Sequence, residues 1–168
     1  MKRRAGITVA GLFFSICFLL GVAANVAGEE YDALKGVTSA KAVFDVRIGD
    51  PKSAAGHLKL IHLTYQDKSL RAVQKTPAFV VVFIGPSVKL ISKNREGFSP
   101  EEQKTLGEIA ATVSGMSKDG IKLEICLFAA KAFGVDPASV LPEIDRVGNG
   151  WISLIGYEAQ GYSLVPVY

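Results

Sequence analysis

Cys126 is the residue of this sequence best placed for nucleophilic chemistry, because it stands between an apolar strand-like run and a helix-like run. At the start of a helix, its sulfur would face free backbone amides and the positive end of the helix dipole, and both stabilise a thiolate. A cysteine flanked by Ile125 and Leu127 also fits a small buried residue of the core. The residues alone leave both interpretations open.

Three short segments end strand-like runs and are candidates for a ligand site: residues 49–51, 85–87 and 126–128. The Gly-Pro-Ser turn at 85–87 can present backbone amides to an anion, although the sequence has neither a GxGxxG nor a P-loop pattern. A purely structural turn is the alternative there. The candidate catalytic residue is Cys126, and the candidate substrate-binding residues are Asp50, Gly85, Pro86, Ser87, Leu127 and Phe128.

Neither a metal nor a cofactor is expected. The two histidines, His57 and His62, are five residues apart, which on a helix places them about 140° apart rather than on one face. We expect His57 to be exposed and His62 to pack in a half-buried position. No histidine or second cysteine neighbours Cys126 in the sequence, and neither a CxxC pair nor a serine-elbow motif is present, so cysteine-protease and thioredoxin chemistry are poorly supported.

Alternating strand-like and helix-like segments must position these residues. Residues 41–48 alternate apolar and polar side chains, which predicts a strand with one buried face. Residues 78–84 are apolar throughout, as in a central strand covered on both faces of a parallel sheet. Asp50 is expected to cap a helix that begins at Pro51 and runs to about residue 68.

A second helix is predicted between Ser99 and Gly120. Ser99, Pro100 and Glu102 form a capping-box pattern, and Gly120 supplies the stop. Its expected buried stripe has the three- and four-residue spacing of a helix: Leu106, Ile109, Ala110, Val113 and Met116.

The remaining chain continues the alternation. Strands are predicted at 121–126, 143–147 and 162–167, and helices at 127–133 and 151–160. This order predicts a three-layer α/β domain with a mostly parallel five-stranded sheet. Ligands of such sheets bind beyond the carboxyl ends of the strands, where the candidate segments end.

Composition and charge exclude several classes. With 168 residues, 49% of them hydrophobic and 21% charged, the chain is typical of one globular domain. Of its 19 basic residues, Lys2, Arg3 and Arg4 precede the first acidic residue, and the rest balance the 16 acidic ones. This balance disfavours a nucleic-acid binder.

The basic start and the apolar run at 7–20 are typical of a secretory signal peptide. The run is short against the ~20 residues that span a bilayer, so we expect cleavage after Ala24 or Ala27 rather than a membrane anchor. The predicted organisation is a signal peptide over 1–27 and one α/β domain over 28–168. We expect the domain to be exported to a bacterial periplasm, free of the membrane, with Cys126 as its single cysteine once Cys17 is removed.

Several segments together resemble the DsrE/DsrF-like family, in its exported single-domain branch. Those that carry the resemblance are Gly-Asp-Pro at 49–51, FIGPSVKLI at 83–91, IKLEICLFAAKAFGVDP at 121–137 and LPEIDRVGNGWISLIGYEAQGYSLV at 141–165. The resemblance implies a flavodoxin-like sandwich that forms homotrimers or homohexamers. It also implies sulfane sulfur held as a persulfide on the cysteine that matches Cys126. Ile84 stands where many relatives carry a histidine.

The main functional hypothesis is a sulfur carrier or sulfurtransferase that needs no cofactor and exchanges sulfur with a thiol-bearing donor or acceptor protein. The alternative is a noncatalytic oligomeric module that binds a small ligand or partner, in which Cys126 is structural. A redox sensor that joins two chains through Cys126 is a third interpretation.

Overall fold

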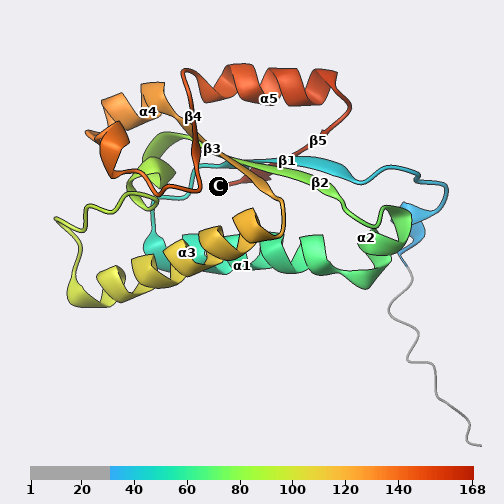
Figure 1. The fold of residues 1–168 in the computed structure, drawn as a ribbon, viewed down its shortest axis with the longest axis horizontal. Helices are drawn as coiled ribbons and strands as arrows, with labels where there is room; N and C mark the ends of the chain where they lie inside the picture. Colours follow the sequence, from blue (N-terminus) through green and yellow to red (C-terminus); the bar gives the residue numbers. More distant parts are fainter. Residues whose placement is uncertain (1–30) are drawn as a thin grey trace, which may run out of the picture.

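The computed structural model describes residues 31–168. The predicted signal peptide, with Cys17 and the cleavage positions Ala24 and Ala27, lies outside the described residues. Five strands form one parallel sheet between two layers of helices (Figure 1). The order in the sheet is β4-β3-β2-β1-β5, with β1 at Lys41–Val46, β2 at Ala78–Phe83, β3 at Lys122–Cys126, β4 at Asp145–Val147 and β5 at Ser163–Val167.

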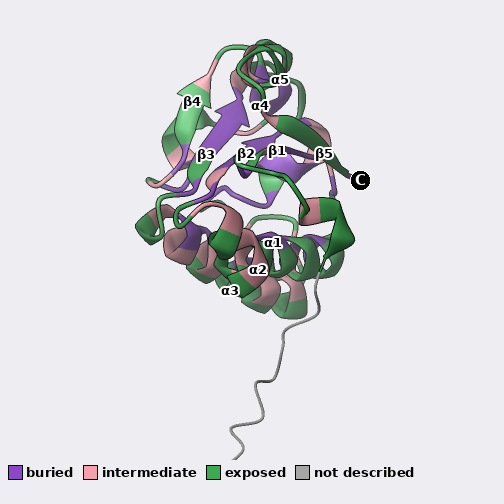
Figure 2. Ribbon diagram, turned by 90° about the vertical axis from the view of Figure 1, so that its right-hand side faces the viewer, coloured by how far each residue is buried: buried purple, intermediate pink, exposed green. Residues whose placement is uncertain are grey.

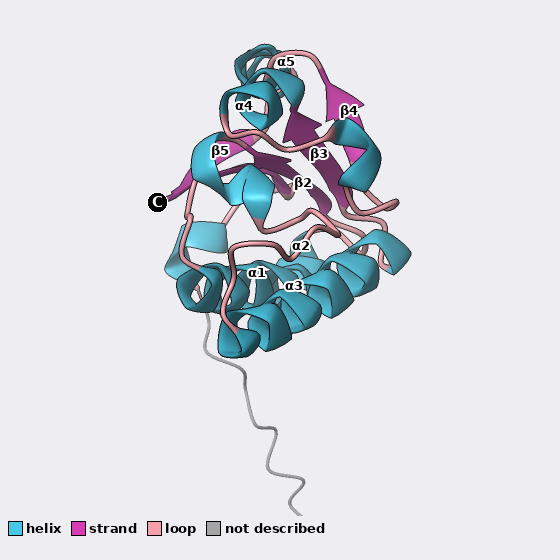
Figure 3. Ribbon diagram, turned by 90° about the vertical axis from the view of Figure 1, so that its left-hand side faces the viewer, coloured by secondary structure: helices cyan, strands magenta, loops and turns pink. Residues whose placement is uncertain are grey.

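The helices divide between the two faces of the sheet (Figures 1 and 3). One face carries α1 (Pro51–Gln66) and α3 (Pro100–Lys118), which pack on each other, with α2 (Lys68–Val73) beyond the end of α1. The other face carries α4 (Leu127–Ala132) and α5 (Gly150–Ala159). The predicted three-layer α/β fold with a five-stranded parallel sheet is therefore confirmed.

Local capping explains where the two long helices begin. The Asp50 carboxylate accepts a hydrogen bond from the Ser53 amide at 2.7 Å, and Pro51 occupies the first turn of α1. At α3, the Ser99 hydroxyl accepts from the Glu102 amide at 3.3 Å while the Glu102 carboxylate accepts from the Ser99 amide at 2.8 Å. Both motifs were readable in the sequence, since they involve neighbours in the chain.

The core lies on both sides of the sheet, along β1, β2 and β3 (Figure 2). β2 is central and buried, as predicted. The prediction of one buried face for β1 is wrong, because Val43 and Asp45 on one face are as inaccessible as Phe44 and Val46 on the other. The physical reason is that β5 pairs with the outer side of β1 and helices cover both faces.

A short helix, α2, was not predicted as a separate element. It begins because the Asp67 carboxylate accepts hydrogen bonds from the Ser69 and Leu70 amides, which restarts the helix just after α1 ends. Within residues 31–168, no helix is both long and apolar enough to cross a membrane.

Candidate functional site

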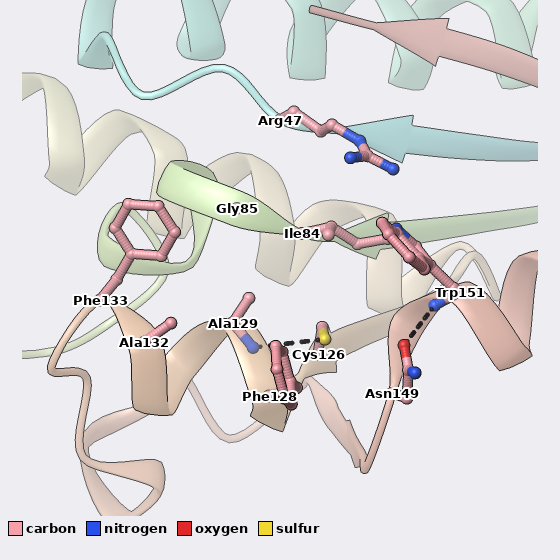
Figure 4. Close-up of a pocket in the computed structure, with 10 residues that line it drawn as sticks. All are labelled: Arg47, Ile84, Gly85, Cys126, Phe128, Ala129, Ala132, Phe133, Asn149 and Trp151. Carbon is pink, nitrogen blue, oxygen red and sulfur yellow. Dashed lines mark hydrogen bonds between the residues drawn. The ribbon is translucent and has the colours of Figure 1, made fainter.

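A cavity of about 300 Å³ lies at the carboxyl edge of the sheet, on the side of α4 and α5 (Figure 4). Four strands contribute to it where they end, because parallel strands bring their carboxyl ends to one edge. Most of its lining is apolar. The lining residues are Arg47, Ile84, Gly85, Cys126, Phe128, Ala129, Ala132, Phe133, Asn149 and Trp151.

Cys126 is both the last residue of β3 and the cap of α4, as the sequence predicted. Its Sγ atom accepts a hydrogen bond from the Ala129 amide at 3.4 Å (Figure 4). The residue is 3% exposed, so its contact with the outside is through the cavity that it lines. The sulfur thus points to the amide end of α4, although it is well packed.

One hydrogen bond caps the start of α5, and another ties the loop before α5 to the start of α4. The Asn149 side-chain oxygen accepts from the Trp151 amide at 3.0 Å and caps α5. The Gly148 carbonyl accepts from the Phe128 amide at 3.1 Å and ties the loop after β4 to α4. These bonds place the cavity between the two helix starts.

Three aromatic side chains border the cavity. Phe128 and Trp151 are 74% and 58% exposed, whereas Phe133 is only 38% exposed. Leu154 of the same helix is buried, whereas Trp151 stays at the surface because its position in the first turn of α5 faces the cavity.

On the same face of β3 as Cys126, the buried Glu124 carboxylate pairs with the exposed Lys122 side chain. The Glu124 carboxylate, 3% exposed, accepts a hydrogen bond from the Tyr157 hydroxyl at 2.7 Å and lies 3.0 Å from the Lys122 ammonium group. Burial by itself raises the pKa of Glu124, but hydrogen bonds from Tyr157, Ser153 and Lys122 outweigh it, and the pKa falls below its ordinary value. Glu124 is therefore ionised and neutralised by Lys122, and it is not a proton donor at neutral pH.

The predicted site residues do not all meet. Gly85, Cys126 and Phe128 line the cavity, whereas Asp50 caps α1 and is exposed. The Ser87 hydroxyl is buried and donates to the carbonyls of Val46 and Ile84, as a structural turn requires. Pro86 and Leu127 are not among the lining residues either; Pro86 packs against Gly49.

Seven lining residues were not among the predicted site residues: Arg47, Ile84, Ala129, Ala132, Phe133, Asn149 and Trp151. Arg47 was not predicted as a site residue because the strand was expected to continue to residue 48. In the structure, β1 ends at Val46 and Arg47 lies at the edge of the sheet. The position of Asn149 could have been predicted, since an asparagine directly before a predicted helix is a typical cap.

The histidines take no part in the site. His57 is exposed, and its Nδ1 atom lies 2.8 Å from the Ser53 carbonyl. His62 is half-buried as expected, with Nε2 2.7 Å from the Asp119 carboxylate at the end of α3. Across the described part of the chain, no group of three metal-binding side chains comes together.

Comparisons with known proteins are consistent with this architecture. Residues 41–167 match the DsrE/DsrF-like family. An uncharacterized protein of Aquifex aeolicus (strain VF5) is 25% identical over 127 residues, which are 75% of this chain and 55% of that protein. The chain thus spans about half the length of the curated relative that it matches.

Two solved structures are similar in fold. MTH1491, a protein of unknown function from Methanobacterium thermoautotrophicum, aligns with a TM-score of 0.58 at 16% identity, over 76% of this chain and 99% of that one. The ychN protein from E. coli aligns with a TM-score of 0.47 at 12% identity, over the same shares of the two chains. At these identities, the likeness to MTH1491 speaks for the fold alone.

Proposed function

Because the chain belongs to the DsrE/DsrF-like family, which is linked to sulfur relay, we propose that it carries sulfane sulfur as a persulfide on Cys126. The observation that carries this proposal is the position of the Cys126 sulfur. It lines the cavity at the carboxyl edge of the sheet and accepts a hydrogen bond from the Ala129 amide. A donor aimed at the sulfur is the contact that supports negative charge there.

The reaction is an exchange between thiolates in two steps. In the first, the Cys126 thiolate attacks the outer sulfur of a donor persulfide, a new S–S bond forms, and the donor thiolate leaves with the electron pair of the broken S–S bond. In the second, an acceptor thiolate attacks the outer sulfur of the Cys126 persulfide, and the Cys126 thiolate leaves in turn. One sulfur atom moves, there is no net oxidation or reduction, and the exchange requires no cofactor.

The chain has three tasks in this exchange. The Ala129 amide is a preformed donor to the sulfur that gains and loses charge. The apolar walls at Ile84 and Phe133 limit water around the persulfide. The exposed ring of Phe128 at the cavity is a contact for the donor or acceptor.

Intact-protein mass spectrometry tests the proposal. The full chain carrying Cys17→Ser has Cys126 as its single thiol and is incubated with inorganic polysulfide and then with a small thiol. We expect an added mass of one sulfur, about 32 Da, that the thiol removes. Cys126→Ser is the matched control because serine can still cap α4. A folded protein that never gains the sulfur at Cys126 contradicts the proposal.

A noncatalytic binding module is the second candidate, favoured by the 3% exposure of Cys126. In that function the cavity holds a ligand and the sulfur is packing. Alkylation of the native protein separates the two candidates. A carrier cysteine reacts in the folded protein, and a structural cysteine reacts only after denaturation.

A further inference from the structure

Of the described residues that line the cavity, Arg47 alone has a charged side chain. It directly follows β1, while Cys126 ends β3, and β2 lies between these strands. Neighbouring strands are about 4.8 Å apart, so the backbones of Arg47 and Cys126 are separated by about 10 Å across the end of β2. Figure 4 shows the two side chains on either side of Ile84.

The guanidinium group of Arg47 is held in place by three neighbours. Its Nε atom donates to both oxygens of the buried Asp45 carboxylate, at 3.0 and 2.9 Å. Its central carbon lies 6.0 Å from the ring centre of Trp151 and 5.8 Å from that of Tyr168. These contacts fix the guanidinium plane without using the two terminal nitrogens.

The terminal nitrogens of Arg47 have no hydrogen-bond partner within residues 31–168. They are donors in the fork geometry that matches a carboxylate or sulfonate. The nearby Asp45 carboxylate offsets the arginine charge, so selectivity must come from hydrogen-bond geometry more than from net attraction. Among residues 31–168, no acidic side chain lines the cavity to repel an anion.

We infer that the cavity selects sulfane-sulfur donors that carry an oxyanion, a carboxylate or a sulfonate, which binds the terminal nitrogens of Arg47 while the outer sulfur faces Cys126. This inference rests on the proposed function and adds the substrate class. A short organic persulfide that ends in a carboxylate is the simplest donor of this class, since Arg47 and Cys126 line the same cavity. As in the proposed exchange, the outer sulfur moves to Cys126, and the donor leaves as a thiolate that still carries its oxyanion.

The test compares two donors with the same three-carbon chain, the persulfide of 3-mercaptopropionate, which ends in a carboxylate, and the persulfide of 3-mercaptopropanol, which ends in a hydroxyl. The readout is the rate of sulfur addition to Cys126 in the full chain carrying Cys17→Ser. We expect the carboxylate donor to react faster. In the double variant Asp45→Asn, Arg47→Gln, that advantage should fall by about tenfold, the loss of one charged hydrogen-bond pair. The paired change leaves no buried charge without a partner.

Arg71→Gln is the control, because Arg71 lies on α2, away from the cavity, and should keep the advantage. The persulfide of 2-mercaptoethanesulfonate, which also leaves as a thiolate that carries its oxyanion, is a third donor that separates sulfonate from carboxylate recognition. A wild-type rate that is equal for both persulfides, or a double variant that keeps the advantage, would overturn the inference and leave the proposed function intact.

A binding measurement distinguishes a failure of the inferred substrate class from a failure of the proposed function. Trp151 is the single tryptophan of the chain and lies beside Arg47, so its fluorescence reports on the cavity. In Cys126→Ser protein, which cannot accept sulfur at residue 126, 3-mercaptopropionate should change this fluorescence at a lower concentration than 3-mercaptopropanol. The double change Asp45→Asn, Arg47→Gln should remove the difference. Equal binding of the two thiols contradicts the inference even if sulfur transfer is observed. Selective binding without any transfer contradicts the proposed function instead.

Discussion

Gly150 lies so close to Cys126 that a Cβ atom on Gly150 would stand 3.0 Å from the Cβ atom of Cys126. The same atom would lie 2.9 Å from two side-chain carbons of Ile84. The lack of a side chain at Gly150 therefore allows the first turn of α5 to approach the end of β3. This close approach forms one wall around the candidate nucleophile.

Gly150→Ala should destabilise the protein by about 1–3 kcal/mol, because the new methyl group forces Ile84 and Cys126 to move in a packed region. Gly156→Ala is the matched control on the same helix, where an added Cβ meets nothing within 4 Å. That change should instead stabilise α5 by about 0.5–1 kcal/mol. Urea denaturation of both variants checks the pair, and equal stabilities would contradict the packing described for Gly150.

Tyr157→Phe should remove about 1–3 kcal/mol of stability at neutral pH, because the buried Glu124 carboxylate loses a hydrogen-bond donor. The folded pKa of Glu124 lies below its ordinary value of 4.5. Its contribution to stability is thus complete above that value and is lost as pH falls through the lower folded pKa. In Tyr157→Phe this acid-induced loss should be smaller.

Tyr162→Phe is the control for this pH dependence, since the Tyr162 hydroxyl makes no hydrogen bond in the part of the chain that the structure describes. Denaturant titrations from neutral pH down past 4.5 measure both variants. The assignment to Glu124 fails if Tyr157→Phe and Tyr162→Phe share the wild-type pH profile.

Asp50→Ala should lower the melting temperature without changing sulfur loading on Cys126, because Asp50 caps α1 and does not line the cavity. The hydrogen bond from the Ser53 amide holds the pKa of Asp50 below its ordinary value, so this cap weakens only in acid. Asp50→Asn keeps an acceptor and should retain most of the stability. If a folded Asp50→Asn protein no longer takes up sulfur on Cys126, Asp50 has a role in substrate binding after all.

The family resemblance implies homo-oligomers, and we propose that α5 forms the contact between copies. Ile152 and Ile155 are 69% and 67% exposed on that helix, an apolar surface that a second copy would cover. Ile155→Asp should shift the protein to a smaller species in analytical ultracentrifugation. Leu60→Asp, at a residue 60% exposed on the opposite side of the sheet, should not. The same sedimentation for wild type and Ile155→Asp would count against this surface.

The sequence was informative wherever the controlling contacts are local. The caps at Asp50 and Ser99 involve atoms three residues apart, and both helices begin where the motifs place them. Cys126 stands at a strand-to-helix junction for the same reason, since the change from a strand pattern to a helix pattern is visible in neighbouring residues.

Tertiary structure decided what lies beside the sulfur and what the cavity contains. No local pattern predicts that β1 lies between β2 and β5. This position buries Asp45 and leaves Arg47 at the edge of the sheet near Trp151. Strand order depends on pairing between segments far apart in the chain. The sequence by itself determined the elements and the junction that holds Cys126, because these follow from periodicity and capping; only the folded sheet brought the ends of its strands together into one cavity.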